Sequence, residues 1–199
     1  MAYVTCDIGM SVDGYSAGPN QSQTEPLGEG GEELHRWMFE EPELHTAERQ
    51  SIVDAGAFIM GRNMFGPVRG QWPEDELWIG WWGEDPPYHA PVFVLTHEAR
   101  SPQPMQGGTT FHFVTKGVAA AFELAKEAAG TRNISIAGGA DTVRQFLNRG
   151  LIDELRLHIA PVVLGAGERV FEGVKDLRLE QMSVTSSTLV THVRYRVLR

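Results

Sequence analysis

The sequence has very little cysteine and no long apolar run. Its one cysteine, Cys6, leaves no partner for an internal disulfide and too few thiolates for a cysteine zinc site. No stretch of 18 apolar residues suggests a membrane span, and the N-terminus lacks the basic start and apolar core of a signal peptide. We therefore expect a protein of the reducing cytoplasm.

Positive charge is also scarce. The formal net charge is -9, and no run rich in lysine or arginine interrupts it. An acidic chain repels nucleic-acid phosphates and anionic membrane surfaces, so neither is an expected partner. Any phosphate that binds here must be held by a few local groups.

Several catalytic motifs are missing as well. There is no Walker A sequence, the segment "GAGERV" lacks the third glycine of the dinucleotide fingerprint, and "GMSVDG" is too long for a serine nucleophile elbow. No two of the seven histidines have the i, i+3 or i+4 spacing of helical metal ligands. We expect no metal site and interpret the histidines as surface or structural residues.

What is present is the pattern of one globular domain over residues 1–199, with 42% apolar residues. Short apolar strands alternate with helical patterns up to Gly150, and the remainder alternates like antiparallel strands. This order predicts an α/β fold with a mostly parallel sheet, helices on both faces and an antiparallel C-terminal hairpin.

Three short junctions follow predicted strands. They are Gly61-Arg62 after "FIM", Thr96-His97 after "VFVL" and Gly138-Gly139 after "ISIA". Ligands of open α/β sheets bind at the carboxyl ends of parallel strands, so the three junctions could face one elongated anionic ligand such as a dinucleotide.

The glycine pair is the most informative junction. Gly138 and Gly139 precede a helical pattern, whose N-terminus offers free N–H groups and a positive dipole end. Glycine also lets another group approach the main chain closely. The pair is therefore either a phosphate cradle or a tight turn, and the residues alone leave both readings open.

A tryptophan-rich segment, residues 72–82, holds four of the five tryptophans. Its aromatic side chains either close over the core or a subunit contact, or form a lid over a flat substrate ring. The sequence leaves its role open.

The segments "MSVDGYSAG", "AFIMGRNMF", "VFVLTH", "ISIAGGADTVRQFL" and "LIDELRLHIAPVVLGAGERVFEG" occur in this order over most of the chain. Together they resemble the dihydrofolate reductase-like superfamily, in particular its branch with the reductase domain of riboflavin biosynthesis. The resemblance implies a three-layer dihydrofolate reductase-like fold. It also implies NADPH-dependent hydride transfer to a C=N or related bond of a pterin-like or pyrimidine-like substrate.

The resemblance further implies roles for individual residues. A cis peptide is expected between Gly138 and Gly139, beside the cofactor pyrophosphate. Glu33 and Asp13 are the candidate catalytic residues, and Trp37 is a candidate substrate contact. The candidate cofactor-binding residues are Met10, Ser11, Gly61, Arg62, Asn63, Thr96, His97, Gly138, Gly139, Ala140, Asp141 and Thr142.

Simpler interpretations stay open for several of these residues. Arg62 could form an ordinary surface salt bridge, His97 could be an exposed loop residue, and Asp13 could hold a turn. Glu33 could be a solvated glutamate at a helix N-terminus. As a whole, the chain could also be an NADP-binding or structural protein without reductase activity. We expect a homodimer, as is common for related proteins.

Overall fold

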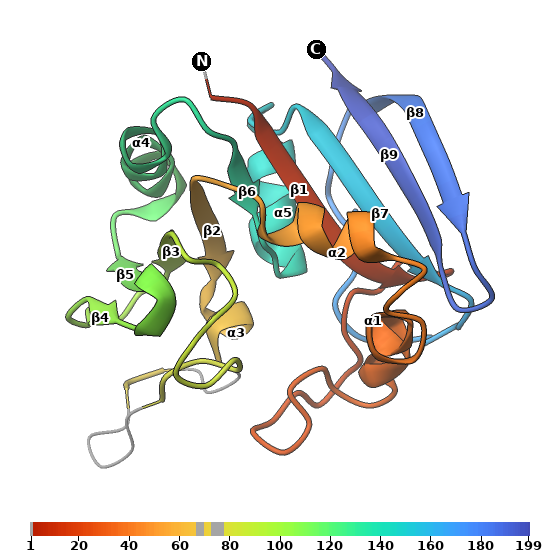
Figure 1. Ribbon diagram of the computed structural model, residues 1–199, viewed down its shortest axis with the longest axis horizontal. Coiled ribbons are helices and arrows are strands. Elements are labelled where there is room, and N and C mark those ends of the chain that lie inside the picture. The colour runs from red at the N-terminus through yellow and green to blue at the C-terminus, as the bar shows by residue number, and fades with distance from the viewer. Residues whose placement is uncertain (1, 67–69, 73–77) are drawn as a thin grey trace.

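The computed structural model describes residues 2–66, 70–72 and 78–199 (Figure 1). In this part of the chain the strands form one sheet, in the order β4-β5-β3-β2-β6-β1-β7-β9-β8. The strands are β1 (Val4–Ser11), β2 (Ala57–Gly61), β3 (Pro91–Leu95), β4 (Gln103–Pro104), β5 (Thr110–Val114), β6 (Ile134–Ile136), β7 (Glu154–Ala160), β8 (Arg178–Ser186) and β9 (Thr191–Leu198).

The helices are η1 (Gly31–His35), α1 (Arg36–Glu40), α2 (Thr46–Val53), α3 (Arg62–Phe65), η2 (Gln106–Gly108), α4 (Gly117–Ala129) and α5 (Ala140–Leu147), where η marks a 3-10 helix. Among the described residues, no helix has both the length and the apolar character needed to cross a bilayer.

The centre of the sheet is parallel, as the sequence predicts. β1 pairs in parallel with β6 and β7, β2 with β3 and β6, and β3 with β5. At the C-terminal edge β9 is antiparallel to both β7 and β8. The predicted mixed sheet, with antiparallel strands at its C-terminal edge, is confirmed. Because the central strands are parallel, the loops that follow their carboxyl ends lie at the same edge of the sheet.

The side chains of β1 point alternately to two faces of the sheet that differ in chemistry. Alternate side chains of a strand point to opposite faces. On one face, its apolar residues from Val4 to Met10 join a core with residues of α4 and α5, such as Ala121 and Phe146. On the other face lie Asp7 and Gly9, where η1, α1 and α2 cover the sheet (Figure 1). Helices on both faces are thereby confirmed.

β8 departs from the expected burial of a strand. It lies at the edge of the sheet, and nearly all of its residues are exposed. It pairs with β9 through a register shift between Gln181 and Ser183. β8 lacks the two-residue alternation of apolar and polar side chains by which half-buried strands are recognised, so the sequence does not predict it.

Candidate functional site

Two of the expected junctions meet at the carboxyl ends of β2 and β6. The Gly61 N–H donates to the Gly138 carbonyl oxygen at 2.8 Å. A Cβ atom on Gly61 would lie 2.5 Å from Thr142 Oγ1, on α5. Only a residue without a side chain allows this approach, so Gly61 fixes the start of α5 against the end of β2.

The glycine pair has the conformation that the resemblance implies. The Gly138-Gly139 peptide bond is cis, and Gly138 has φ of +99°, which favours glycine. A Cβ built on either residue meets nothing within 4 Å, so the main chain borders open space. No side chain caps the N-terminus of α5, and its first N–H groups have no partner within the helix. This arrangement fits a phosphate.

Arg62 directly follows Gly61 and is the first residue of α3. Its guanidinium carbon is 3.1 Å from the ring centroid of Trp72, a cation–π stack. All three guanidinium nitrogens are buried, and among the described residues they have no hydrogen-bond partner. Burial, and next the charge of Arg100, lower the pKa of Arg62 to about 10, so the group stays charged at neutral pH. A charged guanidinium with five unused N–H donors needs an acceptor.

Arg100 is a second cation at this site, and the sequence analysis missed it. Its guanidinium carbon lies 4.8 Å from the Trp72 ring centroid and 4.9 Å from that of Phe113. It donates to the Trp78 carbonyl at 2.8 Å and to Gln103. The only sequence signal for Arg100 was its place three residues after His97. This signal is weak, because arginines and lysines are common in loops.

The tryptophan-rich segment packs mainly inward. The Trp72 indole N–H donates to the Glu98 carbonyl at 3.0 Å, and that of Trp78 donates to the Phe65 carbonyl at 2.8 Å. Trp81 stacks edge-on against Trp78, and Trp82 is half exposed. Residues 73–77 lie outside the described chain. The contacts of Trp72 and Trp78 agree with aromatics that close over the core.

At the end of β1, Ser11 and Asp13 hold the loop. Ser11 Oγ donates to Asp13 Oδ1 at 2.6 Å, and the Leu164 and Gly165 N–H groups donate to the same carboxylate at 3.1 and 2.7 Å. The Ser11 hydroxyl, followed by these amides, lowers the pKa of Asp13. An ionised, fully engaged carboxylate suits a positioning role better than proton donation. Met10, the residue before Ser11, is buried in the core.

The third junction follows β3. Thr96 is buried, and its hydroxyl accepts from the Glu98 N–H at 3.1 Å, so it shapes the turn. His97 is exposed. Asn63 lies in α3 next to Arg62. The first turn of α5 carries Asp141, which pairs with Arg144 at 3.3 Å and accepts from Gln145 at 2.7 Å. The cofactor-binding roles of these residues stay predictions.

The candidate acid and substrate contact lie on η1 and α1. Glu33 is half exposed and pairs with Arg36 at 3.1 Å. Trp37 is 1% exposed, and its ring packs against those of His45, His158 and His192, 4.7 to 5.3 Å between centroids. The packing of Trp37 accounts for its burial without a substrate, and its predicted substrate contact stays a prediction.

η1 approaches β1 very closely at His35. A Cβ on Gly9 would lie 3.1 Å from His35 Cε1, so the imidazole packs on the bare strand backbone. Burial, and next the charge of His158, lower the pKa of His35 from 6.5 to about 4. His35 is therefore neutral in the folded protein at neutral pH.

Comparison with known proteins places this geometry in a family. The model of the RibD C-terminal domain matches residues 2–193. The chain belongs to the RibD C-terminal domain family. It is 26% identical over 195 residues to the uncharacterized protein YyaP of Bacillus subtilis strain 168, covering 96% of this chain and 90% of that protein.

Solved structures confirm the dihydrofolate reductase-like fold. A putative riboflavin biosynthesis protein from Shewanella sp. PV-4 superposes over 100% of both chains, with TM-score 0.69 and 23% identity. Dihydrofolate reductase from Enterococcus faecalis, complexed with NADP(H), covers 98% of this chain and 96% of its own, with TM-score 0.57 and 11% identity. At these identities the likeness concerns the fold.

The low pKa of His35 predicts acid sensitivity. Below pH 6.5 the unfolded chain binds a proton at this residue, whereas the folded chain binds it only near pH 4. This contribution to stability is therefore complete above pH 6.5 and is lost as the pH falls toward 4. Between about pH 7.5 and about pH 5, the parent should lose about 2 kcal/mol more unfolding free energy than His35→Leu.

Urea denaturation followed by tryptophan fluorescence measures this difference. The control His97→Leu, at an exposed histidine, should lose as much stability as the parent. Equal pH dependence in the parent and His35→Leu would contradict the burial of a neutral His35.

Proposed function

We propose that this protein is an NADPH-dependent reductase of a small heterocyclic substrate of the pterin or pyrimidine class. The observation that carries the proposal is Arg62, which directly follows Gly61 and whose three buried guanidinium nitrogens have no hydrogen-bond partner among the described residues. Leaving charged donors unsatisfied is costly. A phosphate of a bound dinucleotide would satisfy them.

The groups around Arg62 support the same ligand. The open space at Gly138 and Gly139 admits a pyrophosphate to the main chain, and the uncapped α5 presents N–H donors to it. Asp141 places a negative charge at this helix end, but its contacts with Arg144 and Gln145 compensate part of that charge. We propose that Gly138 to Thr142 border the pyrophosphate.

Selectivity for NADPH over NADH follows from local cations. In a chain with net charge -9, Arg62 and Arg100 form a positive pair around Trp72. A charge-assisted contact with an additional phosphate contributes roughly 1.5 to 3 kcal/mol, or about one to two decades in affinity. Thr96 and His97, at the end of β3, would lie near the 2'-phosphate.

The hydride is supplied by NADPH when it is bound. The protein must then place a proton on the reduced bond. Glu33 is the proposed donor, since its carboxylate is half exposed and lies on the helix to which the family resemblance assigns the acid. Asp13 would keep the β1 end and the loop at Leu164 in place on the nicotinamide side. Trp37 would contact the substrate ring, as the resemblance implies.

A second candidate function is an NADP-binding protein without reductase activity. It is favoured by the engagement of both carboxylates, Glu33 with Arg36 and Asp13 with the loop. For either function we propose a single domain over residues 1–199, a cytoplasmic location and a homodimer. The exposed apolar side chains of Met182 and Val184 on the edge strand β8 offer a surface for self-association.

Replacing Arg62 tests the proposed function directly. In Arg62→Gln, the dissociation constant for NADPH should rise at least about tenfold, because one charge-assisted phosphate contact is lost. The constant for NADH should rise less if Arg62 faces the additional phosphate. Calorimetric titration of both cofactors measures these changes.

Arg132→Gln is the matched control, because Arg132 is an exposed arginine that forms an ion pair with Asp54 at 3.5 Å. Its affinity for NADPH should stay within about twofold of the parent. An Arg62→Gln variant that binds NADPH as tightly as the parent would refute the phosphate assignment.

Replacing Glu33 separates the two candidate functions. With a pterin or aminopyrimidine that supports NADPH oxidation, Glu33→Gln should lower kcat by about 100-fold or more while leaving NADPH affinity unchanged. Glu32→Gln, an exposed neighbour in the same turn, is the control and should retain full activity. If Glu33→Gln turns over substrate as fast as the parent, Glu33 is not the proton donor. NADPH binding without turnover of a broad panel favours the binding protein.

A further inference from the structure

Four histidines that are far apart in sequence gather on the polar face of the sheet. His158 on β7 and His192 on β9 are cross-strand partners, and His45 precedes α2. Their rings surround Trp37, and His35 adjoins His158. Three of them, His45, His158 and His192, are at most 4% exposed. The proposed reductase chemistry uses none of these three.

The ring nitrogens of three histidines form a continuous chain. His158 Nδ1 lies 2.7 Å from His192 Nδ1, and His192 Nε2 lies 3.0 Å from His45 Nδ1. Beyond them, His45 Nε2 lies 3.1 Å from Ser187 Oγ. A neutral imidazole has one N–H donor and one lone pair, so the groups at the two ends of the chain determine where the protons lie.

At one end stands a carboxylate. Asp7 Oδ1 lies 3.4 Å from His158 Nε2, and neither buried atom has another partner within residues 2–66, 70–72 and 78–199. An ionised carboxylate only accepts, so a neutral His158 carries its proton on Nε2. In that form His158 Nδ1 accepts from His192 Nδ1–H. This leaves the lone pair of His192 on Nε2, directed toward His45.

At the other end, His45 Nε2 faces two acceptors. Glu41 Oε2 is 3.4 Å away, and the Ser187 hydroxyl already donates to the Glu41 carboxylate. The Ser187 oxygen therefore accepts from His45 Nε2–H. The lone pair of His45 consequently lies on Nδ1, directed toward His192 Nε2 at 3.0 Å. Two lone pairs that face each other repel, and a shared cation, either a metal ion or an added proton, removes the repulsion.

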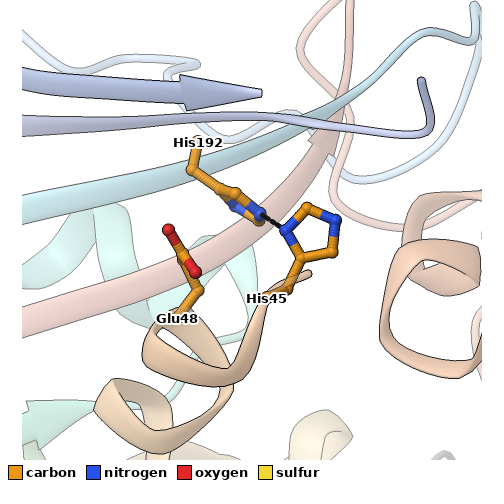
Figure 2. A group of neighbouring side chains, drawn as sticks. All are labelled: His45, Glu48 and His192. Atoms are coloured by element: carbon orange, nitrogen blue, oxygen red, sulfur yellow. Dashed lines mark hydrogen bonds between the residues drawn. The ribbon is translucent and has the colours of Figure 1, made fainter. Parts of the chain in front are cut away.

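Glu48 supplies a third ligand atom. His45 and Glu48 come from the start of α2, and His192 projects from β9 toward them (Figure 2). One nitrogen of each histidine and one oxygen of Glu48 all lie within 4.8 Å of one another. Thr185 Oγ1 donates to Glu48 Oε1 at 2.9 Å and orients the carboxylate. Such outer hydrogen bonds are typical of metal ligands.

We propose that His45 Nδ1, His192 Nε2 and the Glu48 carboxylate bind a divalent transition-metal ion, for which Zn²⁺ is the best chemical match. Two imidazoles and one carboxylate form a common zinc ligand set. Tetrahedral zinc with Zn–N bonds of about 2.0 to 2.1 Å places two nitrogens about 3.3 Å apart, close to the 3.0 Å found here. Glu48 is partly exposed, which gives the ion access and room for a water ligand.

The ion would fasten α2 to the sheet. α2 contributes no fully buried residue, and its apolar residues Ile52 and Val53 are only partly buried, so apolar packing anchors it weakly. Its contacts with the sheet are polar, such as Glu48 with Thr185 and the Ser51 carbonyl with Arg156 at 3.4 Å. A metal bond between His45, Glu48 and β9 reinforces this weak apolar anchor. This role is structural and independent of the proposed reductase activity.

The test is a calorimetric titration of the full chain with Zn²⁺ after treatment with a chelator. We expect one ion per chain and no comparable binding of Mg²⁺ or Ca²⁺, which prefer all-oxygen sites. Saturation with Zn²⁺ should raise the thermal midpoint by about 5 °C or more. Long-range ¹H–¹⁵N spectra should show that His45 Nδ1 and His192 Nε2 lose their lone-pair signature when the ion binds.

His192→Gln and Glu48→Gln should each weaken Zn²⁺ binding at least about tenfold. His112→Gln and Glu43→Gln, outside the cluster, are the controls and should bind as the parent does. Glu48 is partly exposed, so its variant should fold even if His192→Gln does not. Absence of Zn²⁺ binding to the folded parent, or equal binding in Glu48→Gln and the controls, would overturn the proposal.

Discussion

The hydrogen bond from Gly61 N–H to the Gly138 carbonyl, 2.8 Å long, is the contact on which the candidate site depends. It joins the carboxyl ends of β2 and β6, the two strands whose junctions start α3 and α5. Because a Cβ at Gly61 would collide with Thr142, the absence of a side chain sets the spacing of both helices. Arg62, the first residue of α3, and the N-terminus of α5 therefore start from neighbouring junctions.

The sheet divides its chemistry between two regions. The β2, β3 and β6 region carries the cationic and glycine groups suited to a dinucleotide. The β1, β7 and β9 region carries a buried polar layer on one face, with carboxylates and histidines around Trp37. Polar side chains in this layer are expensive to bury unless they are paired, so the layer requires an internal network or a bound ion.

Much of the fold could be predicted from sequence because its signals are local. The alternation from Val4 to Met10 and the buried runs of β2 and β3 identify the parallel sheet, and Gly138-Gly139 marks a strand-to-helix junction. The cis peptide at this junction was implied only by the family resemblance. β8 could not be found, since its exposed residues have no period.

Only part of the candidate site could be predicted from the sequence. Arg62 followed from its place after a strand, whereas Arg100 depends on how the loop folds back over Trp72. The histidine cluster could not be found by spacing, because His45 and His192 are 147 residues apart and meet through strand order alone. Tertiary pairing of this kind leaves no local pattern.

A crystal structure of the protein with NADP⁺ tests the central claim most directly. The account predicts the pyrophosphate at Gly138-Gly139 and the N-terminus of α5, with Arg62 donating to a phosphate oxygen. A dinucleotide bound elsewhere, or an Arg62 that stays unpaired while the cofactor is present, would contradict the account and return the glycine pair to the role of a turn.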